Sequence, residues 1–135
     1  MPHIPLETIQ EGVPFTVSSL GGNTVEVRPF RVMHGKLPIM GYRIGRMAWI
    51  TDMLTMPDSS YDVLKDLDCL VMNALRIEPH WTHQSLSEAL EQAARIGARQ
   101  TWFIHMSHQI GLHAEVDASL PEGIRLAYDG LQLTL

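Results

Sequence analysis

Hydrophobic and polar positions alternate along the first third of the chain in the way that is typical of β-strands. Two extended runs, VPFTV at residues 13–17 and NTVEVRPFRV at residues 23–32, flank the turn-rich stretch SSLGGN, which suits an antiparallel connection. The hydrophobic phase of the second run changes at Pro29, which indicates an edge strand or a bulge at that point. We therefore expect a pair of antiparallel strands here.

Two more extended runs follow, IMGYRI at residues 39–44 and MAWIT at residues 47–51. The two runs are separated by only two residues, Gly45 and Arg46. A glycine at the first position of a two-residue loop is what a type II′ hairpin turn requires. This pattern predicts a tight hairpin with Asp52 directly after its second strand.

Two segments carry the signals of helix ends. Ser59, with Asp62 three residues later, is a weak start signal and predicts a short helix before residue 68. Ser85 with Glu88 forms a stronger capping box, and Gly97 stands where a glycine commonly ends a helix. Between the last two signals, hydrophobic residues repeat at helical spacing at Leu86, Ala89, Leu90 and Ala93. We expect this amphipathic helix to pack on a sheet.

The remaining strand signals lie around these helices. CLVM at residues 69–72 is hydrophobic on both phases, which is typical of a central strand covered on two faces. QTWFI at residues 100–104 predicts another buried strand, and the last thirteen residues predict two short strands around Asp129 and Gly130. Strands and helices in this order predict an α+β fold with a mixed sheet and two helices packed on it.

Composition narrows the classes of function. The 135 residues are 45% hydrophobic and 19% charged with a net charge of −5, as expected for one globular domain over residues 1–135. The basic residues are scattered singly, so no nucleic-acid patch is expected. No hydrophobic run reaches about 18 residues, no secretion signal is present, and the single Cys69 reads as a buried thiol. We expect a cytoplasmic protein without membrane contact.

Four ionisable side chains stand at or just beyond the ends of predicted strands: His34, Asp52, His83 and His105. Ligands of layered α/β proteins usually bind at that edge of the sheet. Imidazoles and a carboxylate together suit zinc, iron or manganese, so His34, Asp52 and His105 are candidate metal ligands. Taken singly, a histidine after a strand is more often a hydrogen-bonded loop or core residue than a ligand, and an aspartate after a threonine is common in turns.

The other histidines are weaker candidates. His80 and His108 could lie behind the ligands and orient them, whereas His113 and His3 are interpreted as surface residues. A serine nucleophile is not expected, since no G-x-S-x-G elbow is present, and no glycine-rich phosphate loop precedes a helix.

Three longer stretches carry a family resemblance: MHGKLPIMGYRIGRMAWITD, DCLVMNALRIEPHWTHQSLSEAL, and FIHMSHQI with the later LPEGIRLAYDGLQL. They resemble the metallo-β-lactamase-fold hydrolases, in particular the phosphodiesterase branch that includes the cyclic-phosphate phosphodiesterase of phosphonate breakdown. The resemblance implies the C-terminal half of an αββα sandwich. It also implies a site for two divalent metal ions, zinc, manganese or iron, and a small phosphodiester substrate.

The resemblance also assigns roles to single residues. His34 would bind the first metal, Asp52 would bridge both metals, and His105 would bind the second metal. His83 would face the scissile group as a proton donor.

The H-x-H-x-D-H motif, which supplies most other ligands in the family, is absent from this sequence. Three interpretations follow. The chain is a metal-dependent hydrolase, expected to be a phosphodiesterase, that is incomplete by itself and binds metal partially or weakly. Alternatively it is a non-catalytic fragment that self-associates, or pairs with a missing N-terminal half, through an uncovered hydrophobic sheet face. The third interpretation is a small binding domain of unrelated ancestry with structural histidines.

Overall fold

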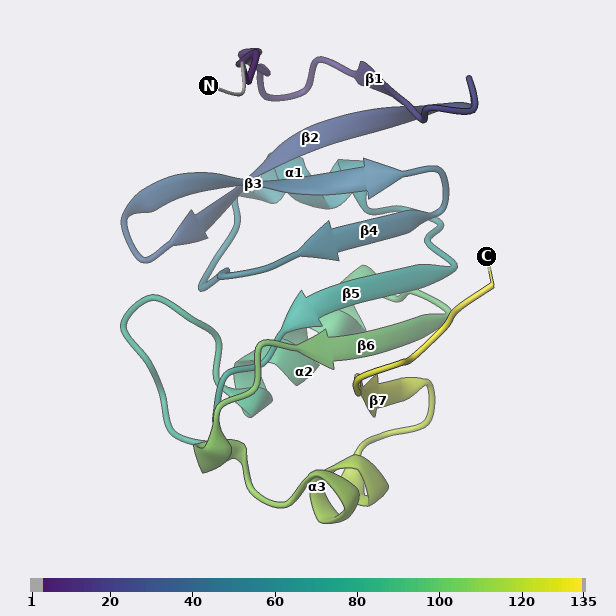
Figure 1. The fold of residues 1–135 in the computed structure, drawn as a ribbon. Coiled ribbons are helices and arrows are strands. Elements are labelled where there is room, and N and C mark those ends of the chain that lie inside the picture. The colour runs from purple at the N-terminus through teal and green to yellow at the C-terminus, as the bar shows by residue number, and fades with distance from the viewer. Residues whose placement is uncertain (1–3, 135) are drawn as a thin grey trace.

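The computed structural model describes residues 4–134 and has one seven-stranded sheet with three α-helices (Figure 1). In chain order its elements are β1 (Phe15–Ser18), β2 (Thr24–His34), β3 (Leu37–Ile44), β4 (Met47–Ile50), α1 (Asp58–Val63), β5 (Cys69–Asn73), α2 (Leu86–Ile96), β6 (Gln100–Ile104), the 3-10 helix η1 (His108–Ile110), α3 (His113–Ser119) and β7 (Ile124–Leu126). The expected α+β class with a mixed sheet is confirmed, but with a third α-helix.

The strands lie in the sheet in their sequence order, and their direction pattern changes at β4. Strands β1 to β4 pair antiparallel, whereas β4, β5, β6 and β7 pair parallel. Strand β2 therefore runs in the same direction as β4, β5 and β6. The carboxyl ends of these four strands meet at one edge of the sheet.

The hairpin between β3 and β4 has the predicted turn. Gly45 has φ +57 while Arg46 keeps an ordinary negative φ, which fits a type II′ turn. At Pro29 the prediction is half right. The β2–β3 register runs without interruption from Arg28 to His34, so no bulge is present, but β1 pairs with β2 only as far as Val27. Pro29 therefore lies beyond the β1–β2 ladder, where its C=O accepts a hydrogen bond from the Gly12 N–H at 2.9 Å and its missing N–H leaves no ladder bond unmade.

Helix α2 follows its sequence signals closely. The Ser85 side chain accepts a hydrogen bond from the Glu88 backbone, Glu88 caps the Ser85 backbone in return, and Gly97 ends the helix with φ +69. Ala89 and Ala93 are buried against the sheet. Helix α1 is present as predicted, but its N-cap is Pro57 without a side-chain bond, so the proposed Ser59 start signal was wrong.

Two predictions for the C-terminal third need correction. Helix α3 was not predicted; it is seven residues long, has no side-chain cap and buries no residue fully. The second of the two last predicted strands is not formed within residues 131–134. The turn itself is present, since Leu131 N–H donates to Tyr128 C=O at 3.1 Å, but the chain beyond it does not pair with β7.

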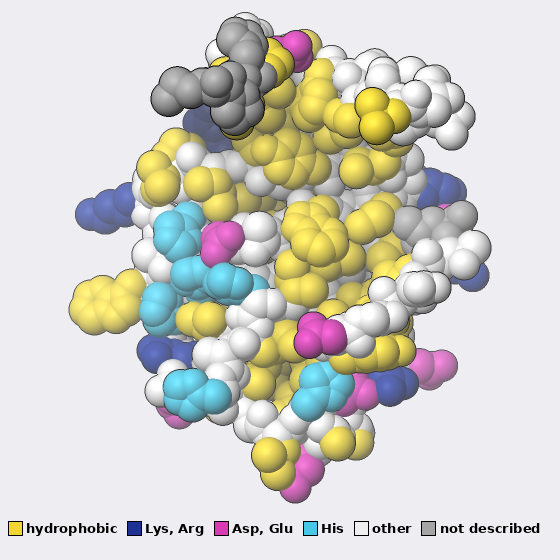
Figure 2. Space-filling model, viewed as in Figure 1, with side chains coloured by type: hydrophobic (Ala, Val, Ile, Leu, Met, Phe, Trp, Pro, Cys, Tyr) yellow, Lys and Arg dark blue, Asp and Glu magenta, His cyan; other side chains and the backbone are white. Residues whose placement is uncertain are grey.

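The two faces of the sheet differ. Helices α1 and α2 cover one face, behind the sheet in Figure 1, where Phe30, Ile50 and Met72 form part of the hydrophobic core. Figure 2 shows the opposite face, where hydrophobic side chains gather over the strands. On that face, Trp49 is 42% exposed and Val17 48% exposed. Among the described residues, no helix is both long and apolar enough to cross a membrane.

Candidate metal and catalytic site

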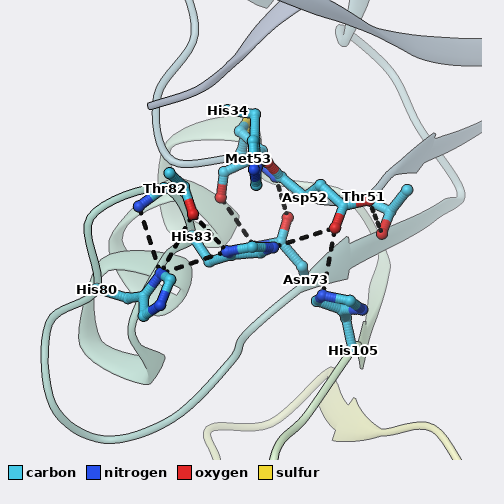
Figure 3. A network of polar contacts seen from close by, with 9 residues as sticks. All are labelled: His34, Thr51, Asp52, Met53, Asn73, His80, Thr82, His83 and His105. Carbon is cyan, nitrogen blue, oxygen red and sulfur yellow. Dashed lines mark hydrogen bonds and ion pairs between the residues drawn. The ribbon is translucent and has the colours of Figure 1, made fainter. Parts of the chain in front are cut away.

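The strand directions bring four of the predicted side chains to one edge of the sheet (Figure 3). His34 is the last residue of β2, Asp52 follows β4, and His105 follows β6. His83 arrives on the long connection between β5 and α2, close to the start of that helix. The prediction that strand-end residues would meet at this edge is therefore confirmed geometrically.

Asp52 stands at the centre of this group. Its Oδ1 lies 3.1 Å from His83 Nε2 and 3.2 Å from His105 Nε2, and its Oδ2 accepts a hydrogen bond from the Thr51 hydroxyl at 3.1 Å. The imidazoles of His83 and His105 stack with their centroids 5.0 Å apart. One carboxylate thus faces two histidines from two different loops.

His34 approaches the same carboxylate residue from the β2 end. Its Nδ1 lies 2.9 Å from the backbone oxygen of Asp52. A carbonyl oxygen can only accept a hydrogen bond, so Nδ1 carries a proton, and the neutral form of the ring has its free lone pair on Nε2. This is the arrangement of a metal-binding histidine whose other ring nitrogen is oriented by a carbonyl.

A second group of contacts orients His83 from behind. The Thr82 hydroxyl lies 2.9 Å from His83 Nδ1, and His80 Nδ1 lies 3.4 Å from the same atom. The rings of His80 and His83 meet edge to face with centroids 5.1 Å apart. The structure therefore places His80 behind His83, on the side away from Asp52.

The backbone at two of these positions has an uncommon conformation. Asp52 has φ +59 and His105 has φ +60, in the left-handed region that costs non-glycine residues free energy. Such residues concentrate at functional sites, where the surrounding structure holds them in place. At both positions the chain turns sharply as it leaves a parallel strand.

Asn73, which sequence reasoning missed, fixes the loop after Asp52. Its fully buried side chain makes two hydrogen bonds of 2.8 Å with the backbone of Met53, one accepted from the N–H and one donated to the C=O. The N–H of Gln84 donates to the same Met53 carbonyl at 2.9 Å. Asn73 thereby ties the Asp52 loop to β5 and to the His83 loop. A polar residue ending the apolar run CLVM was the available signal.

Two pKa shifts describe the charge state of the site. Burial alone would raise the pKa of the Asp52 carboxyl, but hydrogen bonds from His83 and Thr51 and the neighbouring imidazoles outweigh it, so this pKa is lowered. Burial lowers the pKa of His83, against the hydrogen bond to Asp52 that raises it, and the nearby His105 and His34 lower it further. At neutral pH a carboxylate therefore accepts a hydrogen bond from a largely neutral imidazole.

These groups fit a divalent metal. One ligand atom each from His34, Asp52 and His83 lie within 4.8 Å of one another, and neutral imidazoles with a carboxylate are donors for zinc, iron and manganese. His83, predicted as a proton donor, thus belongs to the metal-capable group. His105, predicted as a ligand, contacts the same Asp52 oxygen.

The remaining histidines lie outside this group. His108 is exposed at the start of η1 and is not part of the network drawn in Figure 3. His113 is exposed in α3, as predicted, and its Nε2 lies 3.1 Å from the Ala127 carbonyl oxygen. His3 lies outside the described residues.

Comparisons with known proteins agree with the geometry. Residues 2–106 match a family described as the beta-lactamase superfamily domain. A crystal structure of a diphosphatase from the PhnP family is 39% identical, with a TM-score of 0.81 over 89% of this chain and 46% of that chain. Human tRNase Z, short form, shares the fold at 18% identity and a TM-score of 0.62, over 79% of this chain and 42% of that one.

A curated protein also matches along most of the chain. An octanoyltransferase of Porphyromonas gingivalis (strain ATCC BAA-308 / W83) is 39% identical over 132 residues, which is 97% of this chain and 26% of that protein. The chain therefore spans about a quarter of this curated relative and less than half of the similar diphosphatase.

Proposed function

The chain belongs to the beta-lactamase superfamily. We propose that it supplies part of the ligands and the proton donor of a two-metal site that hydrolyses phosphodiesters. His34, Asp52 and His105 are the proposed metal ligands, with Asp52 as the bridge, and His83 is the proposed proton donor. The carrying observation is the Asp52 carboxylate, whose Oδ1 faces histidines from two separate loops at 3.1 and 3.2 Å.

When bound, two divalent metal ions in such a site polarise the phosphoryl oxygens and lower the pKa of a bound water. The chain's own residues prepare the rest. His34 is oriented by the Asp52 backbone oxygen so that Nε2 is free to bind metal. Asp52, as a carboxylate, can offer one oxygen to each of two cations.

His83 suits the role of proton donor through its position. It is mostly buried, with 13% of its side chain exposed, and Thr82 and His80 hold the far side of its ring. Its Nε2 lies 3.1 Å from Asp52 Oδ1. Because its lowered pKa leaves the ring mostly neutral at pH 7, His83 would donate a hydrogen bond to the leaving oxygen as the neutral ring and a proton only in its imidazolium form. Proton donation to a leaving oxygen typically contributes about 10²–10⁴-fold to rate.

The printed names of the relatives differ in what they support. The diphosphatase, at 39% identity and a TM-score of 0.81, favours phosphoryl chemistry. The octanoyltransferase name describes a protein of which this chain matches 26%. That name gives no argument for acyl transfer at the Asp52 site.

The donor count indicates that this chain does not hold two metals by itself. Stable zinc sites normally have four protein donors, or three and a water. His34, His105 and a shared Asp52 leave each metal with one histidine and one carboxylate oxygen. The missing donors would come from polypeptide that covers the open sheet face.

A hybrid protein tests the proposal. This chain replaces the matching 46% of the diphosphatase, and turnover of bis(p-nitrophenyl) phosphate is measured with manganese, zinc or iron. We expect metal-dependent turnover that His83→Ala reduces by about 10²-fold or more while metal content is kept. His113→Ala, an exposed histidine outside the site, is the matched control. A folded, metal-loaded hybrid without turnover, or an unaffected His83→Ala variant, would refute the proposal.

The open sheet face favours a second candidate function, a non-catalytic fragment that self-associates. Trp49, Val17 and Val25 are 42%, 48% and 41% exposed on that face, and contiguous apolar surface of this kind marks contact sites. Light scattering and metal analysis on the 135-residue chain decide this candidate. Dimers or larger assemblies that Trp49→Glu converts to monomers, with little bound metal, would support it; a monomer that binds two metals tightly would exclude it.

A further inference from the structure

Trp81 is a large aromatic side chain placed almost entirely in solvent beside the site. It is 85% exposed and lies in the connection between β5 and α2, the long loop that reaches away from the sheet in Figure 1. Within this loop it follows His80 and precedes Thr82, both of which contact His83. An exposed indole beside the site residues offers a large, rigid, planar contact surface to a ligand.

The loop that carries Trp81 is held in place from two sides. The Arg76 guanidinium donates to the backbone oxygens of Glu78 at 3.1 Å and Pro79 at 2.8 Å, and also to the Gln109 side chain at 3.1 Å. Trp81 is therefore presented by a braced segment rather than by a free loop tip.

The second brace is the turn between β2 and β3. A Cβ atom added to Gly35 would lie 3.3 Å from the Trp81 carbonyl oxygen and 3.0 Å from Thr82 Cγ2, so the two backbones pack closely. Gly35 directly follows His34, the proposed ligand. The backbone of Trp81 is thus fixed relative to the site on the side of β2.

Chain geometry limits how far the backbone of Trp81 lies from that of His83. Trp81 and His83 are two residues apart, so their Cα atoms are at most about 7 Å apart. His83 Nε2 lies 3.1 Å from Asp52 Oδ1. The backbone of Trp81 is therefore tied to the loop that carries His83, next to the Asp52 site.

Two other hydrophobic side chains of the segments that hold Trp81 are also exposed. Ile77 in the same loop is 50% exposed, and Leu37, just after the Gly35 turn, is 59% exposed. Stacking on an aromatic side chain favours any base because every base has a π-face. A sugar phosphate without a base lacks this base–aromatic stacking.

We propose that Trp81 is a specificity-determining residue that stacks on a planar aromatic group, such as a nucleobase, carried by one ester of the substrate. The inference rests on the proposed function in that it places the phosphoryl group at Asp52 and His83. It adds the substrate class: aryl or nucleoside phosphodiesters rather than purely alkyl or sugar ones.

Equilibrium binding to the diphosphatase hybrid in the presence of manganese tests this role, because the hybrid supplies the metal donors that the 135-residue chain lacks. The probes are adenosine 5′-monophosphate and ribose 5-phosphate, with dissociation constants measured by calorimetry. We expect the nucleotide to bind about tenfold more tightly, a factor within the range of one base–aromatic stack. Trp81→Ala should bring this ratio close to one, Trp81→Phe should keep most of it, and Trp49→Ala, another exposed tryptophan, should leave it unchanged.

Each alternative outcome counts against the inference. Equal affinities, no binding of either probe, or a ratio that survives Trp81→Ala would overturn it, provided thermal unfolding shows the variant to be folded. The ratio of the two dissociation constants is a binding measurement and is independent of hydrolysis. A hybrid without metal-dependent hydrolysis would refute the proposed function and leave the ratio standing, whereas hydrolysis with a ratio of one would refute only the role of Trp81.

Discussion

The Nε2 atom of His105 lies 3.2 Å from the Oδ1 atom of Asp52, and both residues have φ near +60. This contact between the β4 and β6 loops therefore joins two left-handed, non-glycine residues. A strand end of ordinary conformation would direct these side chains elsewhere. The backbone strain at both positions is part of what brings the carboxylate and the imidazole together.

A pair of substitutions at His105 separates the side chain from this backbone strain. His105→Gly and His105→Ala both remove the imidazole, but only glycine adopts φ +60 without a Cβ penalty. We expect the glycine variant to be about 1 kcal/mol more stable than the alanine variant in urea unfolding. The same pair at His113, which begins α3 with an ordinary φ, should show the reverse order. An alanine variant at His105 as stable as the glycine variant would contradict the strain.

The sequence predicts those site residues whose position depends only on the strand that carries them. His34 ends a strand, whereas Asp52 and His105 follow one, and the carboxyl ends of strands that run in the same direction meet at one edge. The convergence of these side chains therefore follows from the strand order and direction. The side chain of Asn73 could not be assigned in the same way. Its partner is the backbone of Met53, twenty residues away, and this pairing exists only once β4 and β5 are side by side.

The helices and strands likewise differ in how far the sequence predicts them. Alternation and the capping box of Ser85 identify β2 to β6 and α2, because each has a local signal that agrees with its burial. Helix α3 has no cap and no fully buried residue. It is held instead by tertiary contacts of Asp117 with Arg125 and the backbone of Leu126, which no local pattern reports.

The buried Gln84 side chain offers a test of stability. Both atoms of its amide group are buried, and neither makes a hydrogen bond with the residues that the structure describes. A buried amide without partners costs about 1–3 kcal/mol. Gln84→Met keeps the length of the side chain and removes that cost, so we expect a gain of about 1 kcal/mol and a rise in the unfolding temperature of a few degrees. Gln10→Met, at an exposed position, should change little, and a destabilised Gln84→Met variant would show that the amide has an unrecognised partner.

Asp117 predicts a pH-dependent contribution to stability. The Arg125 guanidinium and the Leu126 N–H donate to its carboxylate at 2.9 and 2.7 Å, and the bond from Arg125 is the main cause that lowers the pKa of Asp117 in the folded state. A carboxyl with a lowered folded pKa stabilises the fold above its unfolded pKa of about 3.9, and this stabilisation is lost as the pH falls through the folded value.

Asp117→Asn should therefore cost about 1 kcal/mol at pH 7, and the difference from the unsubstituted chain should shrink as the pH falls below about 4. Urea unfolding at pH 7 and near pH 3 measures both quantities. Asp129→Asn, at an exposed position, is the control. A difference of the same size at both pH values would mean that the charge of Asp117 does not contribute.

The central claim is that Asp52 bridges two metals. Metal content of the diphosphatase hybrid, measured by inductively coupled plasma mass spectrometry on the unsubstituted hybrid and on Asp52→Asn, tests it most directly. Asp58→Asn, at the exposed start of α1, serves as the control for loss of a carboxylate. The account predicts two metal ions per molecule in the unsubstituted hybrid and in the control, and loss of both ions in Asp52→Asn. Two tightly bound ions retained in a folded Asp52→Asn hybrid would contradict it.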